Sequence, residues 1–241
     1  MIPLYDDNPR SIVPIVTFTL LAVNIVIYLW QIVVPTQVEL AYTMIPSAIT
    51  QGTIPRNMPE PGVSPVWLTI FTSMFMHGSF LHLAGNMLYL WVFGDNIEDD
   101  LGHVKFLLFY LVTGVAAAFT HILMSTGNMA YVPTLGASGA IAGVMGGYIV
   151  LHSKAGVVSL VPLGPFATLM TVPAWIVLGL WFVYQVVLNS FEMGGASGGG
   201  VAYGAHIGGF VAGLILIRVF GPKSRRNRAD RFDGVFDDRW R

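Results

Sequence analysis

Six long apolar stretches follow one another along this 241-residue chain, and they restrict it to folds whose helices are surrounded by lipid or by one another. Only 10% of the residues are charged, against roughly 25% in a soluble domain, so a folded surface in water would lack polar cover. One bilayer crossing needs about 20 residues. We therefore predict an all-α membrane protein with a bundle of six transmembrane helices. The six stretches are Ile12–Val34, Ser79–Gly94, Val104–Met124, Gly136–Leu151, Pro173–Phe191 and Val201–Phe220.

The basic residues predict which helix ends face the cytoplasm. Between residues 57 and 217 there are only two, Lys105 and Lys154, and with six crossings both fall on the side of the two termini. More basic residues follow the last stretch, so the positive-inside rule places both termini in the cytoplasm. From the compact six-span form we expect a bacterial plasma membrane. We predict an N-terminal cytoplasmic segment (1–11), a six-helix domain (12–220) and a cytoplasmic tail (221–241).

The cysteine content limits the chemistry open to this chain, whereas its net charge says little about partners. The formal net charge is −1, and we expect no nucleic-acid partner. The absence of cysteine excludes disulfides, cysteine-ligated metals and a cysteine nucleophile. His77, His82 and His206 could converge on a metal ion, but zinc needs three or four ligands and no carboxylate accompanies them. We expect neither a metal nor any other cofactor.

Among the polar side chains inside the predicted spans, four stand out, because each needs a partner or a function there. They are His82 and Asn86 in the second span, Ser138 in the fourth and His206 in the sixth. His82 and Asn86 are four residues apart and so share one helix face. All three spans are predicted to enter from the outer side, which places the four side chains in the outer third of the membrane.

A serine and a histidine at the same depth predict nucleophilic catalysis. A hydroxyl is a weak nucleophile until a base removes its proton. No carboxylate lies in the spans at this depth, so a Ser138–His206 dyad is predicted rather than a triad. The oxyanion then needs donors, which the Ser138 N–H, His82 and Asn86 can supply. Glycines four residues apart, including Gly139 in the fourth span and Gly209 in the sixth, allow the two helices to approach closely.

These residues together resemble those of a known family. Gly136-Ala-Ser-Gly139, Ala-His-Ile-Gly-Gly-Phe at 205–210 and the spacing of His77, His82 and Asn86 resemble the rhomboid intramembrane serine proteases, over roughly residues 65–220. The resemblance implies a six-helix fold with a water-filled cavity open to the outside.

The resemblance also implies roles for single residues. Ser138 would be the nucleophile and His206 the general base and acid, while His82, Asn86 and the Ser138 N–H would form the oxyanion hole. Gly136 would keep space beside the serine, and His77 would be structural. Some family members carry an aromatic residue four positions after the serine, stacked on the histidine. Ala142 stands there instead, so the group that orients His206 stays open, with Tyr203 as a suggestion.

The implied substrates are single-pass transmembrane proteins, which the chain would bind within the lipid membrane and cut near its outer surface. The fifth span and the glycine-rich stretch 192–200 would gate their entry. That stretch repeats Gly-Ala-Ser-Gly around Ser197, but no apolar helix follows to hold the hydroxyl, so we do not expect Ser197 to be a nucleophile. The alternative is a non-catalytic rhomboid-like protein that binds or escorts membrane helices. Such proteins typically lack the serine or the histidine.

Overall fold

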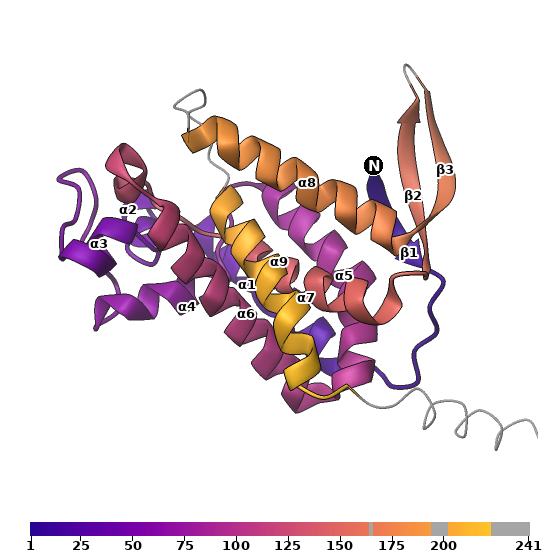
Figure 1. Ribbon diagram of the computed structural model, residues 1–241. Coiled ribbons are helices and arrows are strands. Elements are labelled where there is room, and N and C mark those ends of the chain that lie inside the picture. Colours follow the sequence, from indigo (N-terminus) through magenta and orange to yellow (C-terminus); the bar gives the residue numbers. More distant parts are fainter. Residues whose placement is uncertain (164–165, 194–201, 223–241) are drawn as a thin grey trace, which may run out of the picture.

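A helical bundle makes up most of the chain (Figure 1). The computed structural model describes residues 1–163, 166–193 and 202–222. The long helices overlap the six predicted stretches, and short helices occupy the connections before α5 and after α6. The long helices are α1 (Ile15–Gln31), α5 (Phe80–Leu101), α6 (His103–Met124), α7 (Ser138–His152), α8 (Ala174–Met193) and α9 (Tyr203–Val219). The short ones are α2 (Thr36–Leu40), α3 (Pro46–Gln51), η1 (Val66–Leu68), α4 (Thr69–Ser73) and η2 (Gly127–Tyr131).

Two helices within these described ranges are both long and apolar enough to cross a membrane, namely α6 and residues Ala174–Phe191 of α8. Three more, α1, α7 and α9, are apolar but shorter. Short spans are tolerated where a helix is packed against protein rather than lipid. The structure thus contains a long helix in each predicted stretch, and six crossings remain a prediction.

The expectation of an all-α chain needs one correction, because three strands form an antiparallel sheet in the order β1-β2-β3. Strand β1 (Ile2–Asp6) pairs with the first half of β2 (Gly156–Leu163), and β2 forms a hairpin with β3 (Phe166–Pro173). The stretch between the fourth and fifth spans is rich in β-branched residues and contains Gly164-Pro165 at its middle, which is a hairpin signal. The segment predicted as an N-terminal tail supplies the third strand.

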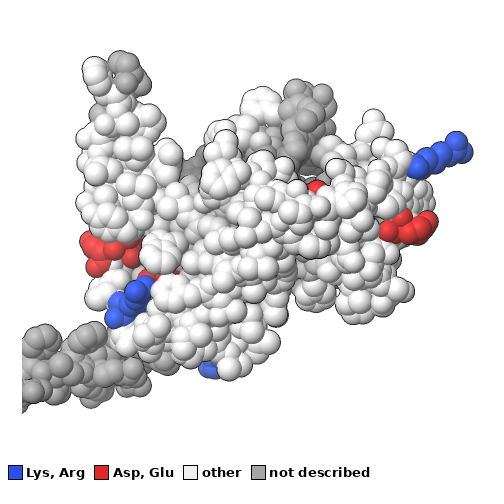
Figure 2. Space-filling view, turned by 180° about the vertical axis from the view of Figure 1, so that it is seen from behind, with Lys and Arg blue, Asp and Glu red and all other residues white. Residues whose placement is uncertain are grey.

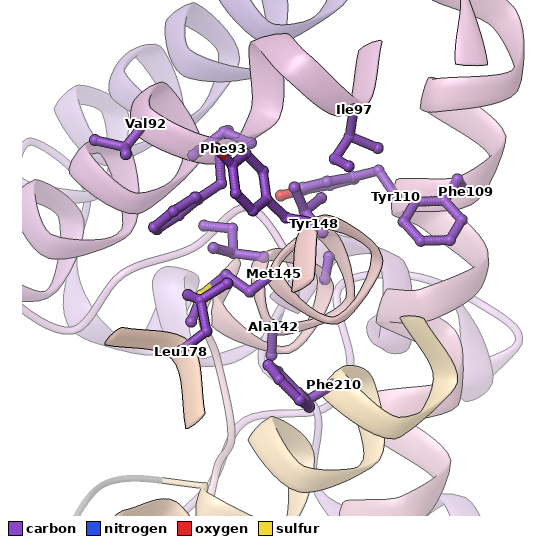
Figure 3. Close-up of a cluster of buried hydrophobic side chains, with 14 of the residues drawn as sticks. Val92, Phe93, Ile97, Phe109, Tyr110, Ala142, Met145, Tyr148, Leu178 and Phe210 are labelled. Atoms are coloured by element: carbon purple, nitrogen blue, oxygen red, sulfur yellow. The ribbon is translucent and has the colours of Figure 1, made fainter. Parts of the chain in front are cut away.

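The core surrounds α7, whose residues from 139 to 148 are all buried. Figure 3 shows Phe93 of α5 and Tyr148 of α7 together in this core, and their ring centroids are 4.9 Å apart in an edge-to-face arrangement. Ala142 points toward Phe210 of α9 in the same view. The small side chain at position 142 therefore faces an aromatic ring from the neighbouring helix.

Glycines bring α7 and α9 into backbone contact. A Cβ added at Gly209 would lie 2.0 Å from the carbonyl oxygen of Gly139, and one added at Gly213 would lie 2.0 Å from that of Gly143. Real Cβ atoms do not approach backbone oxygens so closely, so both positions require glycine. The glycine spacing predicts this close approach, and it sets the distance between the first turns of the two helices.

Buried carboxylates hold the N-terminal segment against the end of α5. The fully buried Glu98 accepts hydrogen bonds from the backbone N–H groups of Val16 and Thr17, at 2.8 and 2.7 Å. It thereby caps the start of α1, which begins after Pro14 without a side-chain cap of its own. Asp99 accepts two further bonds from Ser11. With these partners for its carboxylates, α5 continues through the acidic sequence to Leu101, beyond the predicted end of the stretch at Gly94.

Candidate active site

The polar residues singled out in the sequence lie in the first turns of three helices. Ser138 is the first residue of α7 and His206 the fourth of α9, while His82 and Asn86 occupy the first two turns of α5. All four line one cavity of about 540 Å³. Its size falls within the range of pockets that hold small ligands. Three helices therefore begin at the same end of the bundle and point their first turns into one space.

Ser138 and His206 are in direct contact. The Ser138 Oγ lies 2.7 Å from His206 Nε2, within hydrogen-bond distance. His206 is buried, and Ser138 is half-buried at the cavity wall. The backbone contact of Gly209 with Gly139 explains this proximity, because each glycine lies within one turn of a member of the pair. Such an arrangement allows the imidazole to take a proton from the hydroxyl.

Gln185 of α8 contacts the other side of the imidazole ring, and no motif in the sequence pointed to this residue. Its Oε1 lies 2.7 Å from His206 Nδ1. With this amide oxygen as acceptor, Nδ1 carries the proton and the lone pair of Nε2 faces Ser138. The sequence did contain a signal for Gln185, because its amide side chain lies within a predicted apolar span, as that of Asn86 does.

An aromatic ring from the same helix also contacts the histidine. The Trp181 ring centroid lies 5.6 Å from that of His206, and Trp181 lines the cavity. The suggested Tyr203 lies further away, at 6.4 Å and nearly perpendicular. Trp181 and Gln185 are four residues apart and so share one face of α8. The same face of α8 therefore supplies both a hydrogen-bond acceptor and an aromatic ring to the histidine.

The opposite wall of the cavity carries potential hydrogen-bond donors. Asn86 is buried, and its Nδ2 has no hydrogen-bond partner among the described residues. Gly136 has a φ of 130°, and a Cβ added there would lie 2.9 Å from His82 Nε2 and 3.6 Å from Ser138 Oγ. The His82 ring and the serine hydroxyl therefore border the same small space, which only glycine at position 136 leaves open.

The remaining predicted site residues lie outside the cavity wall. His77 is buried behind His82, with the two ring centroids 5.2 Å apart, and its backbone exchanges hydrogen bonds with the side chain of Gln31. Gly139 faces Ala117 and the start of α9. Within the described ranges, no three His, Asp or Glu side chains are grouped as a metal site. Ser197, most of the glycine-rich stretch and nearly all of the basic tail lie outside the described residues.

Comparison with known proteins assigns this architecture to a family. The model of the rhomboid domain matches residues 64–223, which include every residue of the cavity wall. Because this match covers well over half of the sequence, the chain belongs to the rhomboid family. Members of this family are integral membrane proteins.

Several named proteins are similar to the chain. It is 33% identical over 153 residues to rhomboid protein 1 of Saccharomyces cerevisiae mitochondria, covering 61% of this chain and 40% of the yeast protein. It is 33% identical over 135 residues to the rhomboid protease GluP of Bacillus subtilis, covering 55% of this chain and 25% of GluP. A human presenilin-associated rhomboid-like mitochondrial protein is 41% identical over 73 residues, 30% of this chain and 19% of that protein. The alignments thus cover less than half the length of each of these relatives.

Proposed function

We propose that this chain is an intramembrane serine endopeptidase that hydrolyses peptide bonds with a Ser138–His206 dyad. The 2.7 Å contact between Ser138 Oγ and His206 Nε2 inside the cavity carries the proposal. His206 takes the proton of the hydroxyl as Oγ attacks the carbonyl carbon, and it returns that proton to the leaving amine. In the second half of the reaction, His206 takes a proton from water as the water attacks the acyl carbon. His206 then returns this proton to Ser138 Oγ as the acyl–oxygen bond breaks and the peptide acid leaves.

The neutral Gln185 amide sets this dyad apart from a triad. A carboxylate beside the imidazole would stabilise the imidazolium that forms during the reaction. An amide oxygen fixes the tautomer and the ring orientation without adding a full negative charge. The oxyanion is stabilised separately, by hydrogen-bond donors, for which we propose the Ser138 N–H and the side chains of His82 and Asn86.

We propose that the substrates are single-pass transmembrane proteins, cut near the outer face of a plasma membrane that the chain crosses six times with both termini inside. The basic residues support this orientation. Lys105 Nζ donates to the carbonyl oxygen of Phe220, at 3.0 Å, so the start of α6 and the end of α9 lie together. The cavity is lined by the starts of α5, α7 and α9, at the other end of the bundle. A site opposite the basic end is an outer site under the positive-inside rule.

A direct test uses purified full-length protein in lipid vesicles with a panel of single-span proteins. The proposal expects cleavage, with product masses that place the cut near the outer end of the transmembrane helix. Binding of these helices without any cleaved product would instead support a protein that escorts membrane helices.

The oxyanion donors are tested by His82→Ala and Asn86→Ala. Each substitution removes one donor from the cavity wall, and we expect a fall in kcat of about 10- to 1000-fold with little change in KM. The rate of cleavage of one reconstituted substrate measures this. Leu81→Ala, an exposed residue that lines the same cavity and is assigned no donor role, is the control. Wild-type turnover in both alanine variants would contradict their assignment.

The role of Gln185 is tested by Gln185→Leu and Gln185→Glu. Leucine removes the hydrogen-bond acceptor at His206 Nδ1, so either ring nitrogen can then carry the proton. We therefore expect kcat to fall by about 10- to 100-fold, less than the ~10⁴-fold loss caused by a fixed wrong tautomer in a triad. Glutamate keeps an acceptor and favours the imidazolium, so activity persists while the acid limb of the pH–rate profile moves to higher pH. A merely structural glutamine would not produce this shift. The control is Tyr184→Phe, an exposed neighbour.

A further inference from the structure

The β2–β3 hairpin extends away from the helical bundle next to the start of α8 (Figure 1). Its ladder is continuous from the Gly156–Pro173 pair to the Leu163–Phe166 pair. Strand β1 covers only the base of β2, from Val157 to Leu160, and in the described part of the chain no strand pairs with the outer edge of β3. Among the described residues, the distal half of the hairpin therefore extends beyond β1 and has no helix beside it (Figure 1).

The hairpin has no charged residue anywhere between 156 and 173. Figure 2 shows it as an uncharged column, with acidic and basic side chains gathered at its base. Large apolar side chains are exposed along β3, with exposures of 77% for Phe166, 60% for Leu169 and 47% for Met170. Because side chains alternate along a strand, Leu169 and Met170 point to opposite faces. An antiparallel ribbon in water normally keeps one polar face, and this one has none.

Two features mark the base of the hairpin as a boundary between water and lipid. On the polar side, the Asp7 carboxylate accepts a hydrogen bond from the Gly156 N–H at 2.7 Å, and the exposed Lys154 lies two residues earlier. On the apolar side, the exposed Trp175 is the second residue of α8, a position typical of interfacial aromatic residues. The exposed apolar face of α8 continues from there through Leu180 and Val183. The hairpin thus adjoins a surface that lipid covers in a membrane-embedded member of this family.

We propose that the distal half of the β2–β3 hairpin inserts into the boundary between lipid headgroups and acyl chains, beside the start of α8. Lipid is the occupant that matches an uncharged element with two apolar faces, continuous with a lipid-facing helix. The free edge of β3 places the hairpin in the interface rather than the hydrocarbon core, because its N–H groups still need water. The inference rests on membrane embedding and is independent of the proposed catalysis.

Anchoring of the hairpin has a consequence for the active site. The Ala174 N–H donates to the carbonyl oxygen of Ala155, and the Trp175 N–H to that of Ser153, so the base of the hairpin is hydrogen-bonded across to the start of α8. The same helix carries Gln185 and Trp181 against His206. A hairpin held in the interface therefore fixes the end of the helix that positions the histidine.

The native chain lacks cysteine, so single thiols can be introduced for labelling without removing others. We would attach an environment-sensitive fluorophore to Phe166→Cys and Leu169→Cys in full-length protein in phosphatidylcholine–phosphatidylglycerol vesicles. Quenching by spin-labelled lipids and by aqueous iodide then reports the surroundings of each label. Val112→Cys, exposed on α6, is the lipid-facing control. Tyr5→Cys, exposed on β1 near the base of the same sheet, is the water-facing control.

Insertion predicts that labels at 166 and 169, like the label at 112, are quenched by spin-labelled lipids and are protected from iodide. Shallow spin labels near the headgroups should quench them more than deep ones. Quenching by iodide equal to that at position 5 would overturn the proposal. Protection that disappears when vesicles hold at most one protein would also overturn it, because a second copy would then be the cover. None of these readouts depends on protease activity.

Discussion

Replacing Ser138 with alanine is expected to lower the rate of substrate cleavage by about 10⁴-fold or more, because the nucleophile of a Ser–His pair has no substitute. Substrate binding should be unchanged, since alanine leaves the rest of the cavity wall in place. The rate of product formation from a reconstituted single-span substrate measures the first effect, and co-purification of uncleaved substrate measures the second.

The matched control for this substitution is Ser197→Ala, which removes the serine of the second Gly-Ala-Ser-Gly. It should cleave at the wild-type rate. Equal loss in the two variants, or full activity in Ser138→Ala, would contradict the assignment of the nucleophile. His206→Ala should match Ser138→Ala within a few-fold, because residues that act as a unit are not additive.

Replacing Gly209 with alanine is expected to disrupt the contact between α7 and α9. The new Cβ would lie 2.0 Å from the Gly139 carbonyl oxygen and 3.0 Å from its carbon, and backbone atoms cannot rotate away as a side chain can. Overpacking of this kind costs about 1–3 kcal/mol, and we expect the upper end of that range. A shift of about 1 Å between the first turns of the two helices would cost about 100-fold in turnover.

The thermal unfolding midpoint in detergent and the cleavage rate together measure these effects. Gly179→Ala on α8 is the matched control, because nothing lies within 4 Å of the Cβ it would introduce. Alanine also has the higher helix propensity, so this variant should be as stable as wild type or more so. Equal stability and activity in the Gly209 and Gly179 variants would contradict the account of how the helices place the dyad.

Hydrophobic patterning was sufficient to locate the long helices but not their ends. The sequence-based prediction ends the second stretch at Gly94, where acidic residues begin, whereas α5 continues to Leu101. Carboxylates usually end an apolar span because burying a charge is costly. Here Glu98 and Asp99 find donors on residues more than eighty positions away, at Thr17 and Ser11. Patterns within a window cannot reveal such partners.

The β-sheet was missed for a different reason. Its strand β1 has only five residues and gains stability from pairing with β2, 150 or so residues away in the chain. The apolar runs between the fourth and fifth predicted spans are interrupted by prolines. Without a known partner strand, such runs are interpreted as an irregular connection rather than as strands. Attention to the β-branched content and to Gly164-Pro165 would have suggested the hairpin, though not the third strand.

The cavity residues were recognisable because polar side chains within apolar helices stand out. Ser138, His206, His82 and Asn86 were singled out on that ground, and the structure brings all four to one cavity. Gln185 met the same criterion but matched no motif, so it was not selected. Which residue contacts the histidine ring depends on how α8 packs against α9, and the sequence alone does not specify that packing.

The most direct test of the dyad maps the adduct of a fluorophosphonate probe on full-length protein in native membranes. Peptide mass measurement after labelling should find the phosphonyl group on Ser138, with no adduct at Ser197. The His206→Ala variant should label at least about 100-fold more slowly, because the base that activates the hydroxyl is gone. An adduct on a different serine, or an unchanged labelling rate in His206→Ala, would contradict the proposal that these two side chains form the catalytic pair.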